Sequence, residues 1–298
     1  MNRRVGANTK DHRLFDRLRT DVRRLTFGVA TLCGRPRGFF VPYRQNAATA
    51  VDGSIASYPT IAELLNRRTA AFIEFIRKLD DYATPFASIG QAPPPEPRWT
   101  QDWFPRLDGA AAYAMIRQRR PARIIEVGSG HSTRFMARAI EDGRLATKLI
   151  AIDPAPRASL AGLPIEWLSM PVPAIGRAPF QSLAAGDLLF IDSSHVLMPG
   201  TDVDFLLNDI VPRLPVGALL HFHDIFLPDD YPSQWRWRGY SEQLGVATLL
   251  NSGQWQVLFA SHYAATRLAD HVATSVAGWL PLPSGAFESS LWLERRAA

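Results

Sequence analysis

Apolar positions follow two different periods along the last two thirds of the chain. Short apolar runs predict strands, and apolar residues three or four positions apart predict helices. The predicted strands lie near residues 123–127, 149–153, 164–168, 187–192, 217–223, 255–261 and 289–295. The predicted helices between them lie near residues 106–118, 132–142, 202–213, 236–250 and 263–275. This alternation predicts an α/β fold with a mainly parallel sheet covered by helices on both faces.

The first third of the chain has helical periodicity alone. An apolar stripe predicts one helix around residues 14–25, and a longer stripe predicts a second over 61–82. The proline-rich stretch 92–99 interrupts regular structure. We therefore expect a mainly helical extension over residues 1–98 and the α/β domain over residues 99–298.

The segment RIIEVGSGHSTRFMARAI, residues 123–140, predicts a strand, a tight turn and the start of a helix. Gly128 and Gly130 allow the backbone to turn sharply and to come close to a ligand. The first N–H groups of the helix then face that ligand. We predict a site for a nucleotide-like cofactor here, with Glu126, Ser129 and Ser132 as its other members.

The second predicted strand ends in an acidic residue, Asp153 of LIAIDP. A carboxylate at this position of a βαβ unit is placed to accept hydrogen bonds from ribose hydroxyls. The alternative is an aspartate that only caps the turn before Pro154. The glycine turn favours ribose binding by Asp153.

Polar side chains also end the fourth and fifth predicted strands. GDLLFIDSSH ends in Asp192 with His195 three residues on, and ALLHFHDIFLP ends in His221, His223 and Asp224. Ligands bind outside the carboxyl ends of parallel strands, so Asp192, His223 and Asp224 are expected to converge. Carboxylates and an imidazole suit Mg²⁺, Mn²⁺ or Fe²⁺. His221, in an apolar strand, is predicted to be a hydrogen-bonded core residue.

These segments together resemble class I S-adenosylmethionine-dependent methyltransferases. The Glu126–Ser132 turn resembles their first motif, Glu-x-Gly-x-Gly-x-Gly, with Ser132 at the third glycine position. FIDSSH and HFHDIFLP resemble the family called methyltransferase domain 24, over roughly residues 100–262. The resemblance implies a Rossmann-like sheet of order 3-2-1-4-5-7-6 with an antiparallel last strand. It also implies S-adenosyl-L-methionine as cofactor, bound by the turn, Asp153 and Asp192.

The polar strand ends look like the metal site of metal-dependent O-methyltransferases. That resemblance implies Asp192, His223 and Asp224 as metal ligands, with His223 where those enzymes have an acidic residue. Methyl transfer needs an acceptor oxygen that is held in line and deprotonated. His195 is the predicted base, and His223 takes that role if no metal binds. We expect O-methylation of a small-molecule or saccharide acceptor.

Two other functions use the same residues. His195, His223 and either Asp192 or Asp224 would form a two-histidine, one-carboxylate Fe²⁺ site, typical of an oxygenase or hydrolase on a methyltransferase-like scaffold. A binding module without enzymatic activity is the third hypothesis. The aromatic segment 231–240 either forms the acceptor pocket or anchors the N-terminal segment or a dimer contact.

Composition and charge limit the classes of protein further. The 298 residues, 47% hydrophobic and 20% charged, are typical of a globular protein, and no stretch reaches the roughly 18 apolar residues that span a bilayer. The single Cys33 permits no intrachain disulfide or cysteine-based metal cluster. Since the N-terminus also has no signal-type apolar core, we expect a cytoplasmic location.

The positive charge is concentrated near the N-terminus. Residues 1–44 carry eleven Lys/Arg and three Asp, a net charge of +8, whereas the rest carries 22 basic and 25 acidic residues, a net charge of −3. The basic helix would lie on an anionic membrane surface or an acidic partner, or dock on the catalytic domain or another subunit of a homo-oligomer. The slightly acidic remainder does not favour a nucleic-acid substrate.

Overall fold

The computed structural model describes residues 8–35, 38 and 58–297, in two parts that comprise residues 1–54 and 55–298. The first part contains helix α1 (Asn8–Leu32), which confirms the first predicted helix. Within the described ranges no helix is both long and apolar enough to cross a membrane.

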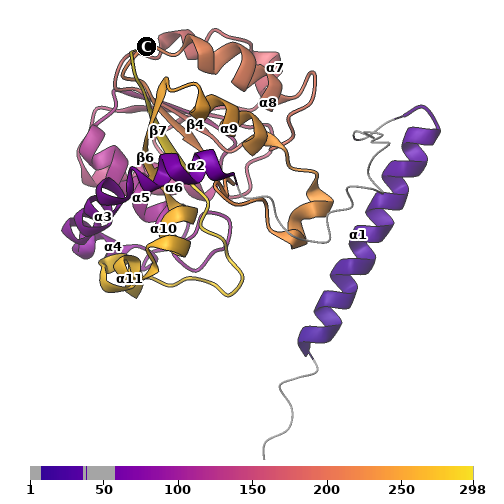
Figure 1. Cartoon of the computed structure of the whole chain (residues 1–298), viewed down its shortest axis with the longest axis horizontal. Coiled ribbons are helices and arrows are strands. Elements are labelled where there is room, and N and C mark those ends of the chain that lie inside the picture. The colour runs from indigo at the N-terminus through magenta and orange to yellow at the C-terminus, as the bar shows by residue number, and fades with distance from the viewer. Residues whose placement is uncertain (1–7, 36–37, 39–57, 298) are drawn as a thin grey trace, which may run out of the picture. The chain divides into compact units, whose positions relative to one another are not determined.

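The second part is built around a sheet of seven strands, in the order β3-β2-β1-β4-β5-β7-β6 (Figure 1). All neighbours are parallel except β7, which is antiparallel to both β5 and β6. This confirms the predicted order and the antiparallel last strand. The strands are β1 (Arg123–Val127), β2 (Lys148–Ile152), β3 (Glu166–Leu168), β4 (Leu188–Ile191), β5 (Leu219–Phe222), β6 (Trp255–Ala260) and β7 (Leu291–Arg295).

Helices cover both faces of the sheet, with α5 and α6 on one side of the strands and α8 and α9 on the other (Figure 1). The α-helices are α2 (Pro59–Asn66), α3 (Thr69–Lys78), α4 (Ala83–Ser88), α5 (Arg106–Arg119), α6 (His131–Asp142), α7 (Val172–Ile175), α8 (Asp202–Phe205), α9 (Glu242–Asn251), α10 (Ser261–Arg267) and α11 (Ala269–Thr274). Short 3₁₀ turns are η1 (Leu79–Tyr82), η2 (Phe180–Ser182), η4 (Val211–Arg213), η5 (Ser233–Arg238) and η6 (Val276–Trp279), and η3 (Leu206–Ile210) is a π turn.

Four predicted helices differ from the observed ones. The helix predicted over 61–82 is divided into α2, α3 and the 3₁₀ turn η1. The helix predicted over 202–213 changes from α8 to η3 and then η4, because Pro212 has no N–H for a continued α-helix. The helix predicted over 236–250 starts only at Glu242, since Gly239 has a φ of 68° and ends η5. Residues 261–274 form two short helices instead of one.

The register of the sheet brings the site together. Val127 of β1 pairs with Ile191 of β4, and Ile191 pairs with Phe222 of β5, so these three strands end at one edge. Their residues are almost all buried apolar side chains, as expected for strands covered on both faces. The polar residues that follow each strand are thereby held side by side.

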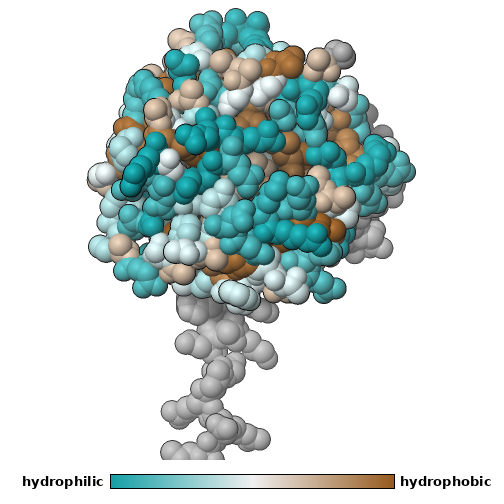
Figure 2. All heavy atoms as spheres, turned by 90° about the vertical axis from the view of Figure 1, so that its left-hand side faces the viewer, coloured by the Kyte–Doolittle hydropathy of each residue, from teal (hydrophilic) through white to brown (hydrophobic). Residues whose placement is uncertain are grey.

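The helical segment 59–88 packs against the sheet part. Phe72 and Phe75 contact Phe259 of β6, with ring centroids 6.0 and 4.6 Å apart, and Tyr82 lies 5.4 Å from Tyr113 of α5. The compact part therefore begins near residue 55, so the expected boundary at 98/99 does not separate two compact parts. Figure 2 shows one face of the molecule, on which hydrophilic positions dominate and apolar ones form small separate patches.

Removing residues 1–54 should leave a chain that unfolds cooperatively near the melting temperature of the full chain. Removing residues 1–98 should abolish cooperative unfolding, because Phe259 and Tyr113 lose the aromatic side chains that cover them. Circular dichroism melts of the two shortened chains test this. A cooperative melt of chain 99–298 would contradict it and favour the boundary at 98/99.

Candidate active site

The turn after β1 needs glycine for two separate reasons. Gly128 and Gly130 have φ values of 76° and 155°, which other residues rarely adopt. A Cβ atom at Gly128 would also lie only 1.9 Å from the backbone oxygen of Asp192. The end of β1 therefore touches the end of β4 at a point where no side chain fits.

Glu126 supports this turn from inside the protein. Its carboxyl group is fully buried and accepts hydrogen bonds from the Ser132 hydroxyl (2.5 Å) and the Thr133 hydroxyl (2.6 Å). Thr133 in turn accepts the N–H of Gly130 at 2.9 Å. Burial raises the pKa of Glu126 to about 8, although these hydrogen bonds oppose the shift. Glu126 lines neither cleft described below, so its position is that of a support rather than a cofactor ligand.

Asp153, which follows β2, caps the turn and lies at a cleft. Its Oδ2 accepts the N–H of Ser129 at 2.7 Å, and its Oδ1 accepts the N–H of Ala155 at 2.7 Å. The side chain also lines an open cleft of about 1070 Å³ over the strand ends. Gly128, Ser129 and Asp192 line the same cleft, which therefore holds these predicted cofactor residues together.

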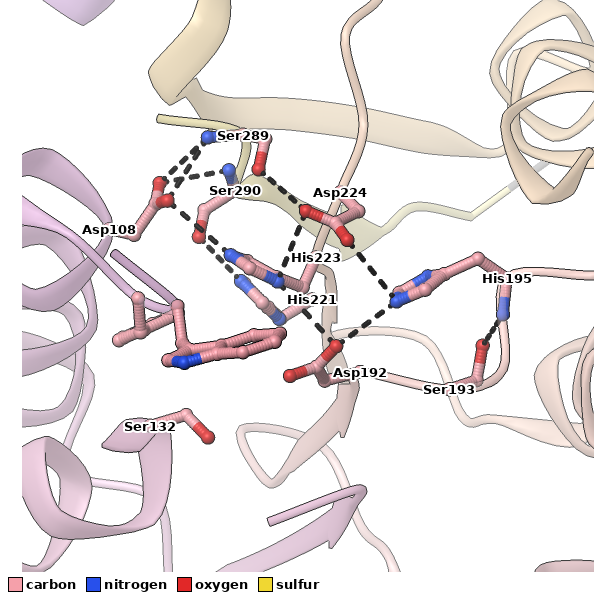
Figure 3. Close-up of polar contacts among 12 residues, drawn as sticks. Asp108, Ser132, Asp192, Ser193, His195, His221, His223, Asp224, Ser289 and Ser290 are labelled. Atoms are coloured by element: carbon pink, nitrogen blue, oxygen red, sulfur yellow. Dashed lines mark hydrogen bonds and ion pairs between the residues drawn. The ribbon is translucent and has the colours of Figure 1, made fainter. Parts of the chain in front are cut away.

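The polar residues after β4 and β5 form one cluster, as predicted (Figure 3). His195 Nε2 lies 3.2 Å from Asp192 Oδ1 and 3.4 Å from Asp224 Oδ2. His223 Nδ1 lies 3.5 Å from Asp192 Oδ1 and 3.6 Å from Asp224 Oδ1. Each imidazole thus faces both carboxylates.

The charges in this cluster stabilise one another. Burial alone would lower the pKa of His195, but hydrogen bonds to Asp192 and Glu242 and the charge of Asp224 raise it well above its ordinary value. For Asp192, burial alone would raise the pKa, but the charge of His223 and the hydrogen bonds from both histidines hold it far below its usual range. The positive charges of the imidazoles and the negative charges of the carboxylates therefore stabilise one another.

Glu242 is a site residue that the sequence did not indicate. It begins α9, is buried, and accepts a hydrogen bond from His195 Nδ1 at 2.8 Å. The carbonyl oxygen of His195 also accepts the N–H groups of Ser241 and Glu242. The predicted helix 236–250 placed Glu242 inside a helix. The signal that could have revealed it is a charged residue at the start of the mainly apolar sequence EQLGVATLL.

A second polar layer lies behind the cluster. Asp108 of α5 is fully buried and accepts the N–H groups of Ser289 and Ser290, and its Oδ2 lies 3.4 Å from His223 Nε2 (Figure 3). His221 is a buried core residue that shares a hydrogen bond of 2.9 Å with the Ser290 hydroxyl. No catalytic role was expected for His221, and its ring lies stacked on Phe190, 3.7 Å away.

The predicted metal ligands Asp192, His223 and Asp224 lie together but do not have the geometry of a metal site. Across residues 8–35, 38 and 58–297, no group of three or more His, Cys, Asp and Glu side chains is arranged to hold an ion. His195 Nε2 lies 3.2 Å from Asp192 Oδ1, whereas His223 Nδ1 lies 3.5 and 3.6 Å from carboxylate oxygens of Asp192 and Asp224. The metal predicted from the sequence stays a prediction.

A second cleft, of about 880 Å³, opens above the cluster. Its aromatic lining comes from three segments, with Trp103 and Phe104 before α5, Trp235 and Tyr240 before α9, and Phe287 before β7. It shares Ser129, Arg157 and Asp192 with the first cleft. The aromatic segment therefore forms pocket walls.

Two of the four aromatic residues predicted in that segment lie elsewhere. Tyr231 is buried and its hydroxyl oxygen accepts the N–H of Gln243 at 3.2 Å, and Trp237 is exposed and does not line the cleft. Within the 3₁₀ turn η5, Trp235 thus lines the cleft and Trp237 does not.

Comparison with known proteins was made by sequence and by structure. The family model described as "Methyltransferase domain" matches residues 125–225. Among curated proteins, none matches the sequence of this chain. The fold is similar to the SAH-bound methyltransferase PaMTH1 of Podospora anserina, at 18% identity over 87% of this chain and 100% of that chain, with a TM-score of 0.41.

Two further solved structures are similar at the level of the fold. The O-methyltransferase TomG of Streptomyces achromogenes, in complex with SAM, has 14% identity over 74% of this chain and 89% of its own, with a TM-score of 0.38. A CmcI structure with Mg-SAM has 14% identity over 63% of this chain and 70% of its own, with a TM-score of 0.35. We draw no conclusion about individual residues from these structures.

The sheet order, the glycine turn and the family match define a class I methyltransferase fold. Residues 125–225 match a methyltransferase domain, and the sheet has the strand order of the class I methyltransferase fold. The matched segment runs from β1 to the residues that follow β5, so it contains the glycine turn and the polar cluster.

Gly128→Ala should destabilise the protein by roughly 2–4 kcal/mol, because it adds a steric clash to the strain of a positive φ. Gly253→Ala is the matched control, since Gly253 has a φ of 74° but no atom within 4 Å of an added Cβ. Urea unfolding of both variants separates clash from strain. Equal losses of stability in the two variants would contradict the close approach of β1 and β4.

Glu126 should make the free energy of unfolding fall as the pH rises from about 4.5 to 8. The folded protein keeps this proton up to about pH 8, whereas the unfolded chain releases it near pH 4.5, the ordinary pKa of a glutamate. The change is on the order of a few kcal/mol. Glu126→Gln should flatten this slope in urea unfolding at pH 5, 6.5 and 8, whereas the exposed Glu63→Gln should not. An unchanged slope in Glu126→Gln would contradict the assignment.

Proposed function

We propose that the protein transfers a methyl group from S-adenosylmethionine to a hydroxyl oxygen of a small-molecule acceptor. The observation that carries this proposal is the junction of the two clefts. Ser129, Arg157 and Asp192 line both, and His195 lines only the aromatic cleft. A donor in the first cleft and an acceptor in the second would meet beside Asp192.

The residues of the first cleft suit the cofactor. Asp153 would hold the ribose hydroxyls, and the turn from Gly128 to Gly130 would let the cofactor lie close to the backbone. Asp192 would lie beside the sulfonium end, where a carboxylate favours a positive charge. When bound, S-adenosylmethionine supplies a methyl group that is already activated, so the protein must align and deprotonate the acceptor.

His195 is suited to take the proton from the acceptor. In the neutral form that a base requires, Nδ1 would donate to Glu242, and Nε2 would give up its contact with Asp192 to accept the hydroxyl of the acceptor. The acceptor oxygen forms a bond to the methyl carbon while the carbon–sulfur bond breaks, and the hydroxyl proton passes to His195 Nε2. Glu242 keeps the ring oriented and stabilises the imidazolium that results.

His195→Asn should lower kcat by about 10²-fold or more, since general-base catalysis contributes about 10²–10⁴-fold. The affinity for S-adenosylhomocysteine should change less than about threefold, because His195 does not line the cofactor cleft. His271→Asn is the control for loss of a histidine outside the clefts. Retained turnover in His195→Asn would reject the base assignment.

Calorimetry with S-adenosylhomocysteine tests the cofactor itself. Binding by the full chain, weakened about tenfold or more in Asp153→Ala, is the expected result. No binding at millimolar ligand would overturn the proposal. Stoichiometric iron in protein purified without chelator, together with no cofactor affinity, would instead favour the oxygenase or hydrolase hypothesis.

Several predictions from the sequence stay predictions. They are the cytoplasmic location, a saccharide as the small-molecule acceptor, a homo-oligomer, and contact of the basic N-terminal helix with an anionic surface or acidic partner. The charge that motivates the last of these is the net +8 over residues 1–44.

A further inference from the structure

Arg238 is a cation at the wall of the aromatic cleft. Its guanidinium lies 4.0 Å from the ring centroid of Trp235, and its Nη1 donates to the Tyr240 hydroxyl at 3.3 Å. The partner in this hydrogen bond is a neutral hydroxyl and not a carboxylate. A half-buried guanidinium stacked in this way keeps donors free for an anion that enters the cleft.

Arg238 and the proposed base lie against the same side chain. The Tyr240 ring is 4.7 Å from the His195 ring, between ring centroids, and 5.4 Å from the Arg238 guanidinium. His195, Arg238 and Tyr240 all line the cleft. The His195 ring and the Arg238 guanidinium are therefore at most about 10 Å apart, a span that one aromatic ring with two polar substituents can bridge.

The charges in the cleft determine which end of the ligand goes where. The end beside His195 also contains Asp192 and Asp224, which would repel a second anion. Asp102 is the other carboxylate of the lining, and it lies on the segment before α5. Arg238 offers a cation away from the Asp192–Asp224 pair, so the anion of a ligand belongs at Arg238 and the hydroxyl at His195.

The other arginine of the cleft is shared with the cofactor side. Arg157 lies 4.1 Å from the ring centroid of Trp103 and lines both clefts. Its charge therefore does not distinguish donor from acceptor. Arg238 lines only the aromatic cleft, so Arg238 is the arginine that can distinguish the acceptor from the cofactor.

We propose that the acceptor is a flat ring that carries a hydroxyl group and, about one ring width away, a carboxylate. Arg238 pairs with the carboxylate, and Trp235 and Phe287 face the ring. This inference rests on the proposed methyl transfer and names its substrate class. The carboxylate is unchanged in the reaction, while the hydroxyl gains the methyl group and loses its proton to His195. A planar guanidinium suits a carboxylate through two parallel hydrogen bonds.

The probes are 3-hydroxybenzoate and 4-hydroxybenzoate, each compared with its methyl ester. Mass spectrometry measures S-adenosylhomocysteine release and the methylated product. The full chain should use at least one acid with kcat/KM at least tenfold above that of its ester. Arg238→Gln should remove this preference by raising KM for the acid tenfold or more, with KM for the ester and for S-adenosylmethionine unchanged.

Arg236→Gln is the matched control, because Arg236 lies in the same 3₁₀ turn but does not line the cleft. Arg238→Lys keeps the charge without the planar pair of donors and should give an intermediate KM. Calorimetry of each acid in the presence of S-adenosylhomocysteine measures binding independently of turnover. Unchanged cofactor binding in Arg238→Gln confirms that the variant is folded.

The outcomes separate the two levels of the proposal. Failure of the full chain to bind S-adenosylhomocysteine would overturn the methyltransfer proposal itself. Cofactor binding together with preference for the esters or for methyl glucoside would overturn only the carboxylate inference. The inference is equally overturned if neither acid binds the cofactor-loaded protein, or if Arg238→Gln and Arg236→Gln behave alike.

Discussion

The close approach of Gly128 to the backbone of Asp192 is the constraint on which the site depends. The parallel ladder continues past the strand ends, since the N–H of Gly128 bonds to Ile152 at 3.0 Å and that of Asp192 to Val127 at 2.8 Å. The N–H of His223 extends it to Ile191 at 2.9 Å. Because the backbones stay in register to this point, the glycine turn, the Asp192 carboxylate and the His223 ring occupy one edge of the sheet.

The buried charges of the site are tolerated because they come from four segments that compensate one another. Asp192 and His195 follow β4, His223 and Asp224 follow β5, and Glu242 starts α9. A buried ion without a partner would cost several kcal/mol, so no one of these groups is stable there alone. Asp108, on α5, completes the arrangement by accepting hydrogen bonds from the backbone N–H groups that lead into β7. The cluster therefore links helices of both faces to the central strands.

The sequence predicted the sheet and most of the site because their signals are local. Strands buried on both faces are continuous apolar runs, and parallel register brings Asp192, His223 and Asp224 to one edge. Glu242 was not predictable in the same way, since its position depends on where η5 ends at Gly239. Metal binding by Asp192, His223 and Asp224 stays a prediction. Residue types indicate a donor set, but the direction of each side chain is decided by hydrogen bonds made after folding.

His195, the proposed base, and the wall of the aromatic cleft are mechanically one unit. The backbone oxygen of His195 accepts two N–H groups at the start of α9, and the hydroxyl of Ser241 accepts the N–H of Leu197 at 2.9 Å. Tyr240 lies directly before this junction and packs on the His195 ring. Changes in the 3₁₀ turn that precedes Tyr240 can therefore alter what the cleft accepts without moving the turn at Gly128.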